Sequence, residues 1–182
     1  FFVSRLDTVI DGQLQALIPE GSEHSNIARN LLGKAAIANA RLAYEIFGEQ
    51  FNGERFEWLR SRGAQIQRPL WASTSTKNPD YRDVRYVEEL IGPNSVNTIP
   101  PQTLRAFQEH GNASLTIQKD LEISRSILNT LEQLGISLDE ATAKLERDGV
   151  QAFNQSYSAL LEAIDEKRSY YTRQLGPLKT KV

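Results

Sequence analysis

The sequence predicts an α/β fold, in which three β–α units with a parallel sheet are followed by a C-terminal helical layer. Two observations support this. Short β-prone runs alternate with longer amphipathic segments over residues 1–117, a pattern typical of β–α units. From residue 118 onward the periodicity is helical. We therefore expect residues 1–117 to carry the β–α units and residues 118–182 to form the helical layer, within one domain.

The first unit opens on the apolar run Phe1–Val3, which we interpret as a buried strand with its start missing, because free amino termini are seldom apolar and β-prone. This suggests the C-terminal part of a longer protein, and a processed mature terminus is the alternative. A polar connector with a short helical stretch follows. The next helix is predicted over residues 25–51 from an apolar stripe formed by Ile27, Leu31, Ala35, Ala38, Leu42 and Ile46. A shorter helix ends at Gly63.

Two further strand–helix units follow. The run "IQRPLWAS" predicts a short buried strand, and residues 83–91 predict an amphipathic helix that ends at Gly92-Pro93. "SVNTI" predicts the third strand, and Pro101 suits the first turn of a helix that runs to His110.

The C-terminal region is predicted to form three helices. The apolar face of the first holds Leu121, Ser124, Ile127, Leu128, Leu131 and Leu134. Residues 137–140, "SLDE", form a capping box that begins the second helix. The third is expected from about Val150 to Leu175, ended by Gly176-Pro177.

The composition excludes several classes of protein. A net charge of -2 and a pI near 5.8 indicate no basic surface for nucleic acid or an anionic membrane. The chain contains no cysteine, which excludes disulfides and thiolate metal sites and fits a reducing compartment. The apolar runs are far shorter than the roughly 20 residues that span a bilayer. We expect a cytoplasmic protein with no nucleic-acid or membrane partner.

Basic and hydroxyl side chains follow the predicted strands. Arg5 comes one residue after the first apolar run, where a guanidinium can hold a phosphate or carboxylate in a bidentate fork. The alternative is a salt bridge with Asp7 or Asp11. After the second strand come Ser73 and Lys77, with hydroxyls between them from Thr74, Ser75 and Thr76. This loop predicts either an anion site or an ordinary solvated loop, and Asn97 and Thr98 are weaker candidates on the third strand.

Other residue types predict little chemistry. His24 lies in a connector and His110 at a helix end, and neither has a second ligand at metal spacing, so we predict no metal site. The doublet Tyr170-Tyr171 could cover the rim of an active site, although core packing is its commoner role. The chain has no nucleotide-binding or hydrolase motif.

Four stretches together resemble transaldolases of the longer bacterial and plant-type subfamily, which includes fusions to phosphoglucose isomerase. They are "FFVSRLDTVID", "GKAAIANARLAYEIF", "RPLWASTSTKNPDYRDVRYVEELIGPNSVNTIPPQTL" and the helical tail. The resemblance covers almost the whole chain. The run "LWASTSTKNPDY" followed by "YVEELIGPNSVNTIPP" is a specific signal, beyond a generic loop pattern.

The resemblance implies a (β/α)8 TIM barrel, of which this chain holds the last three strands, with extra C-terminal helices. It implies transfer of a dihydroxyacetone unit from sedoheptulose 7-phosphate to glyceraldehyde 3-phosphate, giving erythrose 4-phosphate and fructose 6-phosphate in the pentose phosphate pathway. A lysine of the family forms a Schiff base with the ketose, and the iminium accepts the electrons of the broken C–C bond. No cofactor is implied, and the implied partners are sugar phosphates.

The resemblance also sorts the candidate residues. The family's lysine lies on the fourth strand between apolar neighbours, and no lysine of this chain has that setting, so we expect no catalytic residue here and no activity from this chain alone. Arg5 matches the phosphate-binding arginine on the sixth strand, and Ser73 matches the serine on the seventh. Lys77 falls near a second basic phosphate ligand, an arginine in other transaldolases, with two extra residues intervening.

Two other functions stay open at this stage. One is a class I aldolase such as a fructose-6-phosphate aldolase, although those relatives lack the long helical tail. The other is a non-catalytic barrel fragment or binding module. Three strands cannot close a barrel, so we expect a homo-oligomer or association with the missing N-terminal portion.

Overall fold

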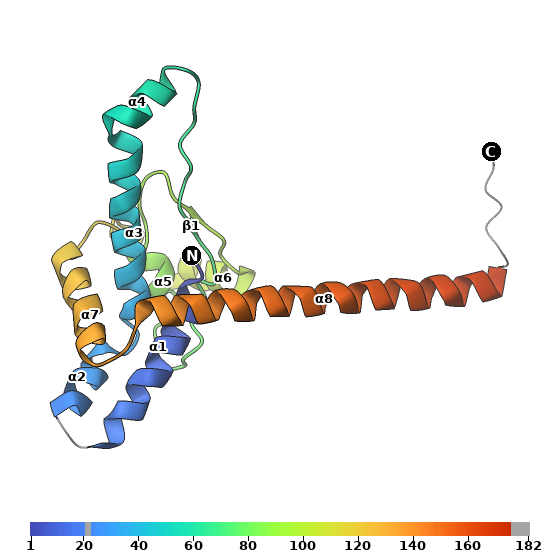
Figure 1. The fold of residues 1–182 in the computed structure, drawn as a ribbon, viewed down its shortest axis with the longest axis horizontal. Coiled ribbons are helices and arrows are strands. Elements are labelled where there is room, and N and C mark those ends of the chain that lie inside the picture. The colour runs from blue at the N-terminus through green and yellow to red at the C-terminus, as the bar shows by residue number, and fades with distance from the viewer. Residues whose placement is uncertain (21–22, 176–182) are drawn as a thin grey trace. The chain divides into compact units, whose positions relative to one another are not determined.

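The computed structural model describes residues 1–20 and 23–175 (Figure 1). The chain divides into two units, Phe1–Ala141 and Thr142–Val182. The first unit contains α1 (Val3–Leu17), a 3-10 helix η1 (Ile18–Glu20), α2 (Glu23–Leu31), α3 (Ala35–Asn52), α4 (Glu54–Arg60), β1 (Leu70–Trp71), α5 (Arg85–Glu89), β2 (Val96–Asn97), α6 (Pro101–His110) and α7 (Leu121–Gln133). Helix α8 (Leu138–Leu175) begins at the end of the first unit and continues through the second.

The strands form a small parallel sheet around β1. Strand β2 pairs with β1 in parallel, with Trp71 opposite Asn97. The first residues of the chain pair with β1 on its opposite edge, because the peptide groups of Leu70 and Ala72 bond to residues 1–3 while those of Pro69 and Trp71 bond to residues 96 and 98. The parallel α/β pattern predicted from the sequence is therefore present, with much shorter strands than expected.

The prediction of a buried strand at the N-terminus is wrong. Phe1 and Phe2 are exposed, and helix α1 begins at Val3. The helix forms because Val3, Leu6, Ile10 and Leu14 recur every three to four residues, and all four are buried. Only a parallel bridge between Phe2 and Ala72 remains of the strand.

The long helix predicted over residues 25–51 is in fact two helices, α2 and α3. The break lies at Gly33, whose φ of 68° is in the left-handed region that glycine adopts without strain. A carboxylate oxygen of Asp11 accepts a hydrogen bond from Gly33 N–H at 2.8 Å, and one of Asp7 accepts from Ala36 N–H at 2.7 Å. Side chains of α1 therefore hold the turn that separates α2 from α3.

Several other elements follow the sequence closely. Helix α6 begins at Pro101 and ends at His110, as predicted, and the helix predicted over residues 83–91 is shorter. The helix start predicted at Ser137 is confirmed by a bond of 3.2 Å from Glu140 N–H to Ser137 Oγ, which is the serine half of the predicted capping box. The two last helices predicted are one continuous helix, α8, because Gly149 does not interrupt it. The predicted stop at Gly176-Pro177 lies outside the described residues.

The core of the first unit lies where α3 packs between α1 and α7 (Figure 1). Its buried apolar side chains include Ile10, Leu14, Ala36, Tyr44, Trp71, Tyr86, Leu90, Ile117 and Leu131. In the second unit, α8 exposes an apolar stripe formed by Val150, Phe153, Tyr157, Leu160, Leu161 and Ile164. None of the helices in residues 1–20 and 23–175 is both long and apolar enough to cross a membrane.

Candidate phosphate site

The carboxyl ends of the three parallel segments are joined by polar side chains. The hydroxyls of Ser4 and Ser73 are hydrogen-bonded to each other at 2.8 Å, which links the first segment to the end of β1. Thr74 Oγ1 donates to Asn97 Oδ1 at 2.7 Å, which links the end of β1 to β2. In parallel β–α proteins ligands bind at this end of the sheet. The arrangement gives hydroxyl and amide groups at the edge where a ligand is expected.

Ser73 has an unusual backbone. Its φ is 57°, in the left-handed region that residues other than glycine seldom adopt. The backbone is held by Ser4, whose N–H donates to Ser73 carbonyl oxygen at 3.0 Å, and by the hydroxyl contact above. Strained residues of this kind are concentrated at functional sites. The strain makes the end of β1 a reasonable place for ligand contact.

Arg5 lies next to Ser4 in the first turn of α1 and is exposed. The expected position at the end of a strand is therefore wrong, yet the residue still lies beside the Ser4–Ser73 contact. Its guanidinium carbon lies 5.0 Å from the centroid of the Phe2 ring, a cation–π arrangement. Within residues 1–20 and 23–175 no ion pair joins Arg5 to Asp7 or Asp11, so the alternative reading as a salt bridge is wrong.

Lys77 is exposed and lies in a different setting from Ser73. Its ammonium donates to Ser75 Oγ at 3.1 Å. It lines a cavity of about 330 Å³ together with Ser4 and the carboxylate-bearing residues Asp7, Asp11 and Asp80. Carboxylates repel a phosphate, so these neighbours make Lys77 a less favourable phosphate ligand than the sequence suggests.

Two aspartates of α1, Asp7 and Asp11, are buried and are hydrogen-bonded to tyrosines. Tyr86 donates its phenolic O–H to Asp7 at 2.7 Å, and Tyr81 donates to Asp11 at 2.7 Å. Burial raises the pKa of Asp7 to about 6, because its hydrogen bonds from Ala36 and Tyr86 only partly replace hydration. Burial likewise raises the pKa of Tyr81 and of Tyr86, and each is raised further by the aspartate it contacts.

Sequence reasoning missed Ser4 and this cluster. Asp7 and Asp11 lie one helical turn apart, on the same side of α1 as the apolar residues Leu6, Ile10 and Leu14. An i, i+4 pair of aspartates on the apolar side of an amphipathic helix was the available signal, because such carboxylates are seldom buried without partners. The signal was hidden by the interpretation of this segment as a strand and a connector.

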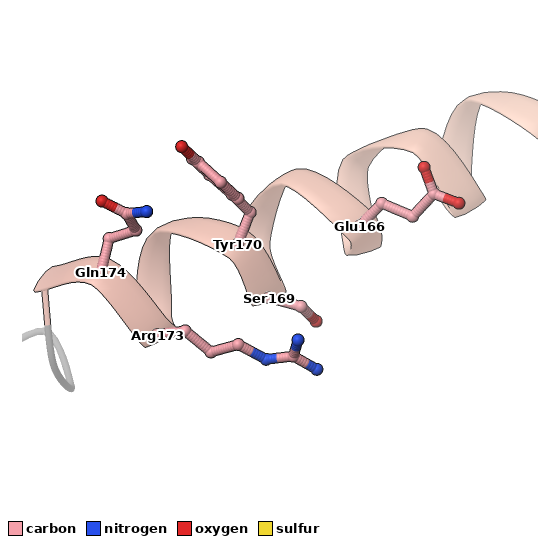
Figure 2. Close-up of a pocket in the computed structure, with 5 residues that line it drawn as sticks. All are labelled: Glu166, Ser169, Tyr170, Arg173 and Gln174. Carbon is pink, nitrogen blue, oxygen red and sulfur yellow. The ribbon is translucent and has the colours of Figure 1, made fainter.

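The remaining candidates contribute no site. His110 is exposed and pairs with Asp83 at 2.8 Å, and the described residues contain no cluster of three or more histidine, aspartate or glutamate side chains suited to a metal. Figure 2 shows the five side chains that line a pocket on α8, Glu166, Ser169, Tyr170, Arg173 and Gln174, all from that one helix. Tyr170 and Tyr171 are both exposed, so the expectation that they pack in a core is wrong for the described structure.

The chain matches known proteins over nearly its whole length. The family model described as transaldolase/fructose-6-phosphate aldolase matches residues 1–164. A transaldolase of Renibacterium salmoninarum is 47% identical over 167 residues, which cover 91% of this chain and 43% of that protein. A transaldolase of Mycolicibacterium smegmatis is 46% identical over 164 residues, 90% of this chain and 43% of the relative. A protein named transaldolase 2 from Streptomyces coelicolor is 42% identical over 180 residues, 98% of this chain and 46% of the relative.

The chain spans less than half the length of the curated relatives it matches. The matched region includes the polar ends of all three parallel segments, from Ser4 to Asn97. On these matches, the chain belongs to the transaldolase/fructose-6-phosphate aldolase family.

Proposed function

We propose that this chain is the phosphate-binding part of a transaldolase. In this proposal residues 1–117 provide the last three strands of a (β/α)8 barrel and residues 118–182 provide the helical layer. The enzyme moves a dihydroxyacetone unit from sedoheptulose 7-phosphate to glyceraldehyde 3-phosphate in the pentose phosphate pathway. The observation that carries the proposal is the pair of hydrogen bonds that joins the carboxyl ends of the three parallel segments, from Ser4 to Ser73 and from Thr74 to Asn97.

Arg5 and Ser73 are the proposed ligands of the substrate phosphate. Arg5 is exposed, unpaired with the aspartates of its own helix, and adjacent to Ser4. Its guanidinium can turn from the Phe2 ring to hold two phosphate oxygens at once. The Ser73 hydroxyl can exchange its bond with Ser4 for a bond to a third oxygen. These two side chains fix the phosphate end of the sugar and so position its ketone for the lysine.

Lys77 is proposed as a weaker third ligand. A lysine acts on phosphate as a point charge and lacks the bidentate geometry of arginine. The Lys77 ammonium already bonds to Ser75 and lies beside three aspartates. These contacts favour a secondary role for Lys77 in phosphate binding, after Arg5 and Ser73.

The chemical step requires a Schiff-base lysine between apolar neighbours, and no lysine of this chain has that setting. We propose that the amine condenses with the ketone of the ketose and releases water. The resulting iminium takes up the electron pair of the C–C bond that breaks, while the hydroxyl on the departing carbon loses its proton and the aldose part leaves as an aldehyde, erythrose 4-phosphate. The enamine then attacks the carbonyl carbon of the acceptor aldehyde, whose oxygen takes up a proton. Water hydrolyses the new iminium, which releases the product ketose and the free lysine. The enzyme needs no metal for this step, and it works in the cytoplasm.

The two activities of the family differ in whether the dihydroxyacetone unit is transferred to an acceptor or released. A transaldolase consumes fructose 6-phosphate when erythrose 4-phosphate is present as the acceptor, and it releases little free dihydroxyacetone. A fructose-6-phosphate aldolase releases dihydroxyacetone from fructose 6-phosphate without an acceptor. The naming of the relatives as transaldolases supports the first activity. Release of dihydroxyacetone at equal rates with and without erythrose 4-phosphate, from the full-length enzyme, would overturn it.

We also expect the 182-residue chain alone to be inactive. Borohydride reduction in the presence of fructose 6-phosphate should add no mass to this chain, because none of its lysines has the apolar setting of the Schiff-base residue. Mass spectrometry of the reduced protein provides the measurement, and the full-length enzyme is the positive control. A reduced adduct on Lys34 or Lys77 would show that the nucleophile lies within this chain.

A further inference from the structure

Three basic side chains surround a second cavity that the phosphate site does not use. The cavity has a volume of about 240 Å³ and lies among α3, α5 and α7. Its basic lining residues are Lys34, Arg41 and Arg85, and its acidic ones are Glu89 and Asp120. The volume is below the roughly 300–1,000 Å³ of sites for drug-sized ligands, so it suits a small molecule.

Arg41 is the most informative of these residues, because its side chain is 91% buried, with only 9% exposed. Its Nη2 donates to Glu89 Oε2 at 2.5 Å, and its Nη1 lies 3.9 Å from Asp120 Oδ2, beyond hydrogen-bond distance. Its Nε is buried and has no partner. A guanidinium has five N–H donors, and among the described residues this one makes a single hydrogen bond. Buried donors without partners are unfavourable, so an acceptor in the cavity would stabilise this group.

The other two cations, Lys34 and Arg85, have fewer carboxylate partners than Arg41 has. Lys34 is exposed, immediately precedes α3, and makes no ion pair within the described ranges. The Arg85 guanidinium lies over the Tyr81 ring at 4.9 Å and also makes no ion pair there, although it acts on the buried Asp7 at longer range. Three cations therefore face two carboxylates, and one of those carboxylates, Asp120, is exposed.

We propose that this cavity binds a small dianion of the phosphate or phosphomonoester class. Arg41 provides the buried fork, and Lys34 and Arg85 complete the charge around the ligand. A ligand in this cavity must compete with the Glu89 and Asp120 carboxylates for the same three cations. A dianionic ligand therefore suits the cavity better than a ligand with a single carboxylate charge. Guanidinium groups bind phosphate oxygens in pairs, which explains why arginine provides two of the three cations.

Inorganic phosphate and fructose 6-phosphate are suitable probes, and the full-length protein is the suitable sample. Amide NMR shifts of Ala38, Arg41 and Ser124, on α3 and α7, report binding at this cavity alone. We expect both probes to shift these signals. Tighter binding of the ester would identify a sugar phosphate as the ligand, and equal binding would identify free phosphate. The absence of shifts in these amides at tens of millimolar phosphate would overturn the proposal.

Three variants test the assignment without disturbing the core. Lys34→Gln removes an exposed charge and should weaken phosphate binding about tenfold, the loss of one charge-assisted contact. Asp120→Asn removes the opposing carboxylate and should tighten binding. Asparagine also tolerates the left-handed φ of 53° at this position. Arg105→Gln, an exposed arginine on α6, is the matched control and should change nothing.

The same experiment separates this site from the proposed substrate site. Arg5→Gln should leave the α3 and α7 shifts unchanged, whether or not Arg5 binds substrate. Arg41→Gln should abolish the shifts in a protein whose circular dichroism is that of the wild type. If Lys34→Gln and Asp120→Asn both bind phosphate as the wild type does, the basic cluster is only an α3–α5 ion pair and the proposal fails.

Discussion

Ser73 combines a strained backbone with a side-chain hydroxyl that bonds to Ser4. A left-handed serine costs free energy relative to glycine, about 1–2 kcal/mol for a residue with a Cβ. Glycine would relieve that strain but would lack the hydroxyl that bonds to Ser4. The serine is therefore best explained by what its hydroxyl does at the end of β1.

The first prediction at this scale concerns Arg5 in the full-length enzyme. Removing a partner from a charge-assisted phosphate contact costs roughly 2–5 kcal/mol, so Arg5→Ala should raise KM for fructose 6-phosphate at least about thirtyfold. The effect should fall mainly on KM, because the phosphate is far from the reacting bond and is held equally in ground and transition states. Steady-state kinetics give the measurement.

Unphosphorylated dihydroxyacetone is the internal control for Arg5, since it has no phosphate to lose. Its kinetics should change little in Arg5→Ala. An unchanged KM for fructose 6-phosphate in a folded variant would limit Arg5 to its cation–π contact with Phe2.

The second prediction concerns the pH dependence that Asp7 gives to stability. Its pKa is about 6 in the folded protein and 3.8 in the absence of burial. The folded state therefore binds the proton more tightly, and ionisation destabilises it as pH rises from about 4 to about 6. The penalty is constant above that range and amounts to about 3 kcal/mol at most. Asp7→Asn removes the ionisation. The free energy of unfolding of this variant, relative to that of the wild type, should therefore rise as the pH increases from about 4 to about 6.

Urea denaturation from pH 4 to pH 7 measures the gap between Asp7→Asn and the wild type. Asp80→Asn, at an exposed position, is the matched control, and its gap should stay constant. A constant gap for Asp7→Asn as well would mean that its hydrogen bonds from Ala36 and Tyr86 keep Asp7 ionised throughout.

At the scale of the element, the sequence predicts the start of a helix correctly where a residue at that start sets the boundary, and fails where the boundary depends on distant residues. Pro101 and Ser137 are such signals, and α6 and α8 begin where those residues predict. The start of α1 and the break at Gly33 could not be predicted, because both depend on partners far along the chain. Val3 N–H bonds to Ala72, and Gly33 N–H bonds to Asp11.

The candidate site was predictable to a similar degree. Arg5 and Ser73 could be proposed from their positions after apolar runs and from the family resemblance. The surroundings of Lys77 could not, because its carboxylate neighbours Asp7 and Asp11 come from α1. Charge around a residue is a property of the folded chain, and spacing alone does not reveal it.

The third prediction concerns Gly33, at the turn between α2 and α3. A Cβ added here would come within 2.6 Å of Tyr81 Cζ and 2.7 Å of Arg85 Nη1, in addition to the strain of the positive φ. Gly33→Ala should therefore lower the free energy of unfolding by more than the roughly 1–2 kcal/mol of backbone strain alone. Gly12→Ala is the matched control in α1, where nothing lies within 4 Å of the added Cβ. It should stabilise the protein by about 0.5–1 kcal/mol. A loss of only about 1–2 kcal/mol in Gly33→Ala would mean that Tyr81 and Arg85 move aside freely and that the positive φ alone sets the cost.

At the scale of the whole molecule, the described chain leaves much apolar surface uncovered. The α8 stripe of Val150, Phe153, Tyr157, Leu160, Leu161 and Ile164 repeats every three to four residues, which is the spacing of a packed helix face. Phe1, Phe2 and Leu70 are also exposed beside the sheet. Apolar patches of this kind mark interfaces or lead to association.

The fourth prediction is that this chain alone associates with itself. Its sedimentation coefficient should rise with protein concentration, because each copy offers the same apolar helix face. Introducing two charges into the stripe, as Phe153→Glu with Leu160→Glu, should reduce the association. Gln155→Glu, which charges the opposite face of α8, is the control. A concentration-independent monomer with a cooperative, high-temperature melt would contradict the prediction.

The register of the parallel sheet sets an order of assembly. Trp71 reaches Thr98 across 27 residues, whereas Ser4 reaches Ser73 across 69. Closing the longer loop costs about 0.8 kcal/mol more in chain entropy, so the pairing of β1 with β2 is the less demanding step. The first residues of the chain then join an edge that already exists. Ser4 is therefore expected to reach Ser73 after β2 has paired with β1, and the proposed phosphate ligand Ser73 gains its hydroxyl partner from a contact between distant parts of the chain.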